Sequence, residues 1–139
     1  MAEQYILALD YGGKRVGVAI AHVVARLPRP LITLENSDTL LNDIRKLVEQ
    51  EDVGLVIVGL PRTMDGGSSA QTRAVENFAR KLEKVLTTPV KLADETLTSV
   101  DAEAALGSRA YNKGEIDAMA ASLILERYFA DHPAMEANA

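Results

Sequence analysis

The sequence predicts an α/β fold: a mixed five-stranded sheet in the order β-β-β-α-β-α-β-α-α, with helices on both faces. Residues 5–21 hold two apolar runs around the pair Gly12-Gly13, which is typical of two antiparallel strands joined by a tight turn. Residues 55–60 form a short, β-branched apolar run ended by Pro61, as expected of a buried parallel strand. Helical periodicity before and after this run favours crossover helices between parallel strands.

The remaining elements follow from periodicity and from the residues that start and stop them. The first strand, residues 5–9, is apolar on both faces and is expected at the centre of the sheet. The other predicted strands are residues 16–21, 31–34, 55–60 and 90–93. The predicted helices are residues 38–50 with Ser37 as N-cap, about 69–86, a short one over 98–107, and about 115–130.

Length, charge and composition limit the classes of protein to consider. The 139 residues suit one domain, expected over residues 1–131, with residues 132–139 as a flexible C-terminal tail. A net charge of -5 argues against binding nucleic acid through overall charge, although it leaves room for a local basic rim. The absence of cysteine excludes disulfides and thiolate zinc sites. Without an apolar run near the roughly 20 residues of a membrane span, a cytoplasmic location is expected.

Three carboxylates stand where an active site would form. Asp10 ends the first strand and Glu95 ends the fifth, so both are expected at the carboxyl edge of the sheet. Asp117 begins the last helix, on an otherwise apolar or small-residue face that includes Ala120, Ala121, Ile124 and Tyr128. Taken singly, Asp10 could form a turn, Glu95 could be exposed, and Asp117 could be a favourable charge at a helix start. Together they predict a site for Mg²⁺ or Mn²⁺, the arrangement used for displacement at phosphorus.

The stretch from Asp10 to Ala19, DYGGKRVGVA, resembles the opening motif of the YqgF (RuvX) family. The resemblance continues through residues 58–61, 64–66, 94–95, 97–99 and 116–117 and so spans nearly the whole chain. It implies an RNase H-like fold and an activity as a Holliday junction resolvase or as a nuclease that matures pre-16S ribosomal RNA. It also implies that Asp10, Glu95 and Asp117 are the catalytic, metal-binding acids. Thr96 stands where the family usually has arginine, which removes one expected basic contact.

Four basic residues near these elements are candidate contacts to nucleic acid: Lys14, Arg15, Arg109 and Lys113. Each could equally be a solvated surface charge, and Arg15 could instead pair with a nearby acid. The first hypothesis is a Mg²⁺- or Mn²⁺-dependent nuclease of structured nucleic acid that processes the 5′ end of pre-16S rRNA. The alternatives are a resolvase of four-way DNA junctions, a non-catalytic module binding nucleic acid or ribosomes, and a phosphotransferase of the actin and sugar-kinase type. Both a monomer and a homodimer remain open.

Overall fold

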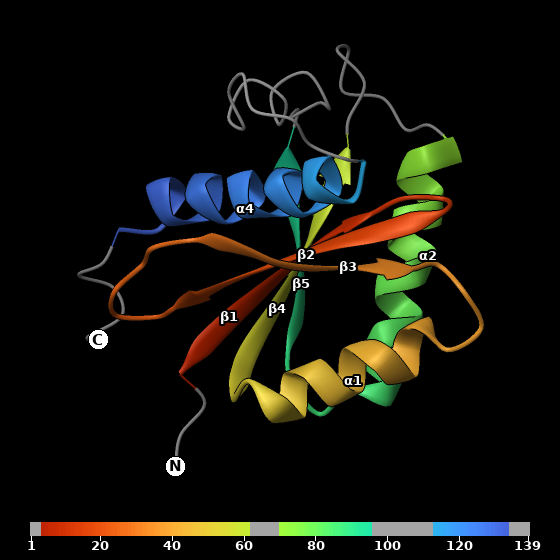
Figure 1. Ribbon diagram of the computed structural model, residues 1–139, viewed down its shortest axis with the longest axis horizontal. Helices are drawn as coiled ribbons and strands as arrows, with labels where there is room; N and C mark the ends of the chain where they lie inside the picture. The colour runs from red at the N-terminus through yellow and green to blue at the C-terminus, as the bar shows by residue number, and fades with distance from the viewer. Residues whose placement is uncertain (1–3, 62–69, 96–112, 134–139) are drawn as a thin grey trace.

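A computed structural model of the chain describes residues 4–61, 70–95 and 113–133. They contain one sheet with strand order β3-β2-β1-β4-β5 (Figure 1). Its strands are β1 (Tyr5–Tyr11), β2 (Arg15–His22), β3 (Arg29–Glu35), β4 (Val53–Pro61) and β5 (Val90–Glu95). The helices in this part of the chain are α1 (Leu40–Gln50), α2 (Ala70–Val85) and α4 (Lys113–Asp131).

The pairing of the strands confirms the predicted mixed sheet. β1 pairs antiparallel with β2 and parallel with β4, so the strand predicted at the centre is the central one. β3 pairs antiparallel with β2, and β5 pairs parallel with β4. The turn between β1 and β2 closes through a 2.9 Å hydrogen bond from Gly12 N to Arg15 O. A Cβ atom on Gly12 would lie 2.6 Å from Arg15 O, so this tight turn requires glycine.

Helices cover both faces of the sheet, α4 on one and α1 with α2 on the other (Figure 1). Alternation along β1 explains the division, because successive side chains of a strand point to opposite faces. Leu7 and Leu9 pack with the residues of α1 and α2, whereas Ile6 and Ala8 pack with those of α4. Among the described residues each face therefore has its own hydrophobic cluster, and the sheet lies between the two.

Several element boundaries differ from those predicted. α1 begins at Leu40 rather than at residue 38, and its N-cap is Thr39, so the prediction of Ser37 as N-cap was wrong. Ser37 still serves the helix start, because its carbonyl oxygen accepts a 3.1 Å hydrogen bond from Leu40 N. α4 begins at Lys113, two residues before the predicted start, which moves Asp117 from the first turn to the beginning of the second. The predicted short helix over residues 98–107 lies outside the described residues.

The C-terminal end of α4 is fixed to the turn between β2 and β3. Arg26 occupies the left-handed region there, with φ 56°, and its guanidinium lies 4.3 Å from the centre of the Phe129 ring. The same side chain donates to Phe129 O at 3.0 Å and to His132 O. His132 stacks on Tyr128 with 4.1 Å between ring centres. Residues 134–139 of the expected tail lie outside the described part of the chain.

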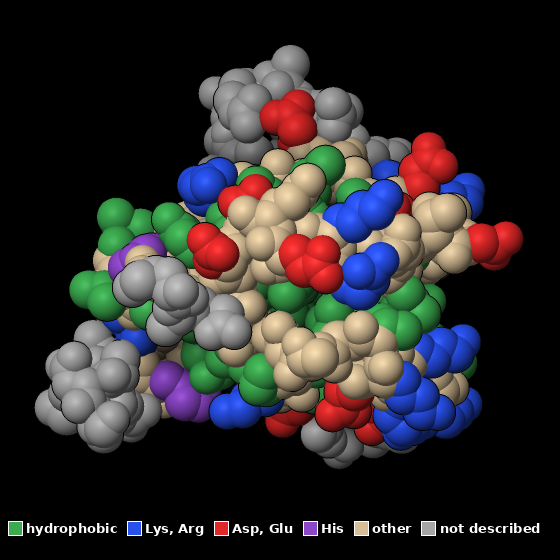
Figure 2. All heavy atoms as spheres, turned by 90° about the horizontal axis from the view of Figure 1, so that it is seen from below, with side chains coloured by type: hydrophobic (Ala, Val, Ile, Leu, Met, Phe, Trp, Pro, Cys, Tyr) green, Lys and Arg blue, Asp and Glu red, His purple; other side chains and the backbone are tan. Residues whose placement is uncertain are grey.

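Charge is distributed without one dominant sign on the side of the molecule where α1 lies. Figure 2 shows acidic and basic side chains interspersed over this face, with apolar side chains between them. Within the described residues, the structure contains no helix with the length and apolar character needed to cross a membrane.

Candidate active site

Asp10 and Asp117, which are far apart in the sequence, meet between β1 and α4. Asp10 shares the α4-facing side of β1 with Ile6 and Ala8. Asp117 approaches from the helix, and its side chain keeps 24% of its surface exposed. Burial, and secondarily the charge of Asp117, raises the pKa of Asp10 from its ordinary value of 3.8 to about 6. The structure therefore brings Asp117 close enough to Asp10 for its charge to oppose the ionisation of Asp10.

Arg15 supplies the counter-charge to this pair. It stands at the start of β2, and its Nε donates a 2.6 Å hydrogen bond to Oδ2 of Asp117. Both side chains are part-exposed, at 37% for Arg15 and 24% for Asp117. The sequence-based alternative that Arg15 pairs with a nearby acid is confirmed. A charge-assisted bond of this length fixes where the Asp117 carboxylate lies.

Glu95 is the last residue of β5, where its Cα partner is Pro61, the last residue of β4. Because β1, β4 and β5 run parallel, the backbone of Glu95 lies at the same carboxyl edge of the sheet as Asp10. The position of the Glu95 side chain is outside what the structure describes. Among the described side chains, no group of three His, Cys, Asp or Glu residues could hold a metal ion. Convergence of all three predicted acids stays a prediction.

The four basic candidate residues differ in whether the structure places them near the carboxylate pair. Lys14 is exposed in the turn between β1 and β2, next to Arg15. Lys113 is the first residue of α4, and its side chain is not described. Arg109, together with Thr96, lies outside the described residues. The structure thus brings two of the four candidates, Lys14 and Arg15, to the edge where Asp10 stands.

Two further residues at this site, Gly17 and Thr33, were not among the candidates. Gly17 is the cross-strand partner of Asp10, and Thr33 is the partner of Gly17 on the next strand. A Cβ atom on Gly17 would overlap the backbone carbonyl of Asp117, so α4 passes directly over this glycine. A glycine inside an apolar strand run is a signal for such a close approach. No comparable sequence signal identifies Thr33, whose hydroxyl donates to Gly114 O at 2.6 Å.

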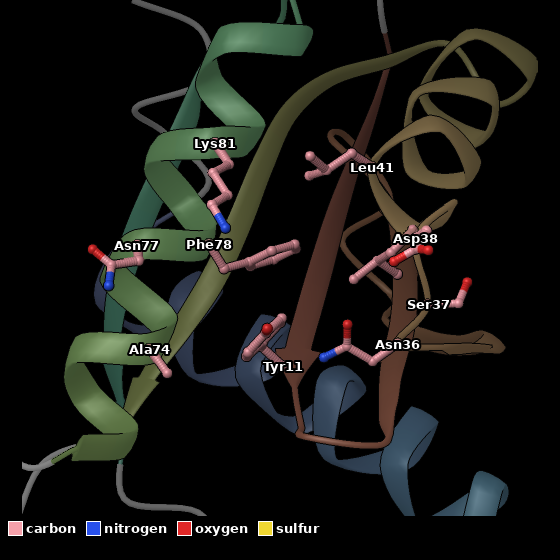
Figure 3. Close-up of a pocket in the computed structure, with 10 residues that line it drawn as sticks. Tyr11, Asn36, Ser37, Asp38, Leu41, Ala74, Asn77, Phe78 and Lys81 are labelled. Atoms are coloured by element: carbon pink, nitrogen blue, oxygen red, sulfur yellow. The ribbon is translucent and has the colours of Figure 1, made fainter.

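A separate pocket of about 340 Å³ lies on the opposite side of the sheet, between α2, the start of α1 and the end of β1 (Figure 3). Its lining includes the rings of Tyr11 and Phe78, stacked 4.3 Å apart, with Asn77 and Lys81 contributed by α2. Asn36, also in the lining, is already engaged, because its Nδ2 donates to Gly12 O at 2.7 Å. None of the predicted site residues whose side chains the structure describes lines this pocket, so the candidate site is the carboxylate pair on the α4 side.

Comparison with solved structures shows the fold. The chain is similar to T. thermophilus RuvC in complex with a Holliday junction substrate, with a TM-score of 0.58 and 12% identity over 94% of this chain and 97% of that one. It is also similar to the Fowlpox virus resolvase in complex with Holliday junction DNA, with a TM-score of 0.52 and 14% identity over 91% of this chain and 97% of that one. At these identities the similarity establishes the RNase H-like fold that the sequence predicted.

Proteins related by sequence share a higher identity with this chain than these two structures do. A protein of Chloroflexus aurantiacus with the name "Putative pre-16S rRNA nuclease" is 42% identical over 134 residues, covering 92% of this chain and 88% of that protein. A protein of Shewanella oneidensis with the same name is 36% identical over 138 residues, covering 95% and 98%. The family described as "RuvX: Holliday junction resolvase" matches residues 4–131. The chain therefore belongs to the RuvX family, as its motifs indicated.

Proposed function

We propose that this protein is a divalent-metal-dependent nuclease that hydrolyses phosphodiester bonds in structured nucleic acid. The observation that carries the proposal is the pair Asp10 and Asp117, held against each other by β1 and α4 in a member of the RuvX family. A carboxylic acid whose pKa is raised by burial and by a neighbouring acid, as that of Asp10 is, is characteristic of functional sites rather than of solvated surface charge. The pair also stands at the carboxyl edge of β1, where α/β sheets usually bind ligands.

The chemistry of these side chains fits Mg²⁺ or Mn²⁺. Both are oxygen donors, and burial together with the nearby charge of Asp117 raises the pKa of Asp10, so a bound cation would supply the compensation that the ionised form lacks. Asp10 and Asp117, with Glu95 from the end of β5 as the third acid, would hold the ion or ions. A bound ion would lower the pKa of a water nucleophile and neutralise charge at the phosphorus under attack.

The chain's own residues supply orientation around that chemistry. Arg15 holds the Asp117 carboxylate through its Nε, which keeps this acid in place while substrate enters. Lys14, exposed in the adjacent turn, is placed to meet a backbone phosphate, a contact that positions nucleic acid without reading its sequence. We assign Lys113 and Arg109 the same role by proximity in the chain to Asp117.

For the substrate, we propose the 5′ end of pre-16S rRNA. The support is the name of the relatives at 42% and 36% identity, which cover nearly the whole chain. A four-way DNA junction is the second candidate, and the description of the matching family favours it. A non-catalytic binding module would have no need of the carboxylate pair, whichever of the two nucleic acids it bound.

The test is cleavage by the purified protein in Mn²⁺, Mg²⁺ or EDTA, with a pre-16S rRNA fragment and a four-way DNA junction in parallel. Asp10→Asn and Asp117→Asn should each lower the rate more than about 100-fold, since even residues that only support metal ligands cost 10- to 100-fold. Asp131→Asn is the matched control, because Asp131 ends the same helix and is exposed. Cleavage of the junction alone would select the second candidate. Metal-independent binding of either substrate without cleavage would leave only the binding module.

A further inference from the structure

We infer that the cross-strand row Asp10, Gly17 and Thr33 is a seat for the start of α4, in which Gly17 and Thr33 are positioning residues that set the place of Asp117 relative to Asp10. The inference rests on the proposed function for the role of the two acids. It concerns a different question, namely what fixes their separation. Three adjacent strands contribute the seat. It consists of the carboxyl group of Asp10, of Gly17, which has no side chain, and of the hydroxyl group of Thr33.

The register of the sheet brings the three residues into line. Asp10 of β1 faces Gly17 of β2, and Gly17 faces Thr33 of β3. Two residues toward the middle of β1, Ala8 lies opposite Ala19, and both of these alanines pack in the hydrophobic cluster of α4. Because the side-chain period of a strand is two, the row of Asp10 lies on the same face of the sheet as that cluster. α4 therefore runs across the row itself.

Gly17 allows the helix backbone to touch the sheet backbone. A Cβ atom at this position would overlap the carbonyl O and C of Asp117 and would lie 2.8 Å from Ala118 N. These are backbone atoms inside α4, so no side-chain rotation can relieve the overlap. Any residue other than glycine must displace the helix at the very residue that carries the acid.

Thr33 fixes the same end of the helix from the other side of Gly17. Its Oγ1 donates a 2.6 Å hydrogen bond to the carbonyl oxygen of Gly114, one turn before Asp117. Arg15, which stands two residues before Gly17, donates to the carboxylate of Asp117. At the far end of α4, Arg26 donates to Phe129 O. With both ends tied, a displacement at Gly17 tilts α4 rather than sliding it freely.

The consequence for the site is a change in the distance between two carboxylates that must share an ion. A misplacement of about 1 Å at a catalytic group can cost on the order of 100-fold in rate. Gly17→Ala should therefore weaken Mn²⁺ binding at least tenfold and lower kcat more than it changes KM for nucleic acid. Gly13→Ala is the matched control, because a Cβ atom on Gly13 has nothing within 4 Å. It should leave both quantities unchanged.

Thr33 provides the milder test should Gly17→Ala fail to fold. Thr33→Val removes the hydroxyl at nearly constant volume, and we expect a threefold to tenfold weaker Mn²⁺ affinity with a faster hydrogen exchange at the start of α4. Thr33→Ser keeps the hydroxyl and should restore both. A merely stabilising role would lower the melting temperature of Thr33→Val without moving the Mn²⁺ dissociation constant of the folded protein.

The measurements are Mn²⁺ titration by calorimetry, steady-state cleavage, and amide hydrogen exchange over residues 113–118. Unchanged Mn²⁺ affinity and unchanged exchange in folded Gly17→Ala and Thr33→Val would overturn the seat. Should the wild type bind no Mn²⁺ and cleave nothing, the proposed function fails by itself. The exchange data then decide the seat separately, with faster exchange in Gly17→Ala than in Gly13→Ala supporting it and equal exchange overturning it.

Discussion

The two faces of the sheet present different side chains to the helices that cover them. Toward α1 and α2, β1 presents Leu7 and Leu9, which join a cluster of large side chains that includes Val56, Val58, Phe78 and Leu82. Toward α4 it presents Ile6, Ala8 and finally Asp10, and the cluster there mixes large side chains with three small ones: Ala19, Ala21 and Ala121. Large side chains hold a helix away from the sheet, whereas alanine and glycine let it lie close. The α4 face thus combines close backbone contact with buried charge.

The face toward α1 and α2 therefore contributes mainly to stability, whereas the face toward α4 carries the candidate site. The α1 and α2 face holds the larger cluster of buried apolar side chains, which contributes much of the hydrophobic free energy of folding. The α4 face accepts an acid whose pKa is raised to about 6 and a cross-strand glycine with no side chain to pack. A site with close-set carboxylates needs that arrangement, and it lowers the stability of the same face.

The sharpest contrast in stability should come from Leu7→Ala. Leu7 is fully buried on the α1 and α2 face, so removing its side chain leaves a cavity and should lower the free energy of unfolding by about 2 to 5 kcal/mol. Leu92→Ala is the control, because Leu92 is 42% exposed and should cost much less. Urea unfolding of both variants measures the difference, and equal losses would contradict the assignment of the main core to this face.

The opposite change tests the α4 face. Ala121 has no exposed surface and packs in the hydrophobic cluster under α4, so Ala121→Leu should overpack the face and cost about 1 to 3 kcal/mol. Ala130→Leu, an exposed position on the same helix, is the control and should be nearly neutral. The displaced helix should also lower Mn²⁺ affinity. A variant as stable as the wild type would show that α4 does not lie as close to the sheet as the structure has it.

Asp10→Asn should stabilise the protein without metal. Because the folded state raises the pKa of Asp10 to about 6, folding favours the protonated acid, and stability falls as the pH rises from about 4 through 6. The asparagine variant escapes this loss, so in EDTA at pH 7.5 it should be more stable by about 1 to 2 kcal/mol, less than the full shift implies, because of solvent screening. At pH 4 the two proteins should match.

With Mg²⁺ bound, the wild type should instead be more stable than Asp10→Asn. Mg²⁺ that binds only the folded state stabilises the wild type by mass action, about 2.7 kcal/mol at 100 times the dissociation constant. The asparagine variant should gain less. Thermal melts in EDTA and in Mg²⁺ at pH 4 and pH 7.5 supply all the comparisons. A variant that melts lower in EDTA and shifts equally with Mg²⁺ would mean that Asp10 is a structural turn residue.

The smallest expected effect is on the salt dependence of nucleic-acid binding, compared between a lysine beside the candidate site and one on the other side of the sheet. Lys14→Ala should reduce the slope of log affinity against log salt by about 0.7 to 0.9, the value of one lost phosphate contact. Lys46→Ala is the control, because Lys46 is exposed on α1, across the sheet from Asp117. Binding titrations at several salt concentrations measure both slopes. Equal slopes for the two variants would remove Lys14 from the interface.

Much of this fold could be predicted because its signals are local. Apolar runs bounded by turn residues identified β1, β2 and β4, and helical periodicity placed α2 within one residue of its observed ends. The same periodicity put Asp117 on the face with Ala121 and Ile124, which are buried against the sheet. Boundaries were less certain, as Thr39 in place of Ser37 shows, because helix ends depend on a few competing hydrogen bonds.

The sequence by itself determined the α/β class and the family, and it predicted Asp10 and Asp117 as acids of the site. Tertiary structure alone decided that Arg15 pairs with Asp117, that Gly17 lies under the backbone of α4, and that Thr33 ties the start of that helix. The physical reason is distance along the chain. Periodicity and turn chemistry act over a few residues, whereas these contacts join segments more than 80 residues apart, and only strand register and helix docking determine which of them meet.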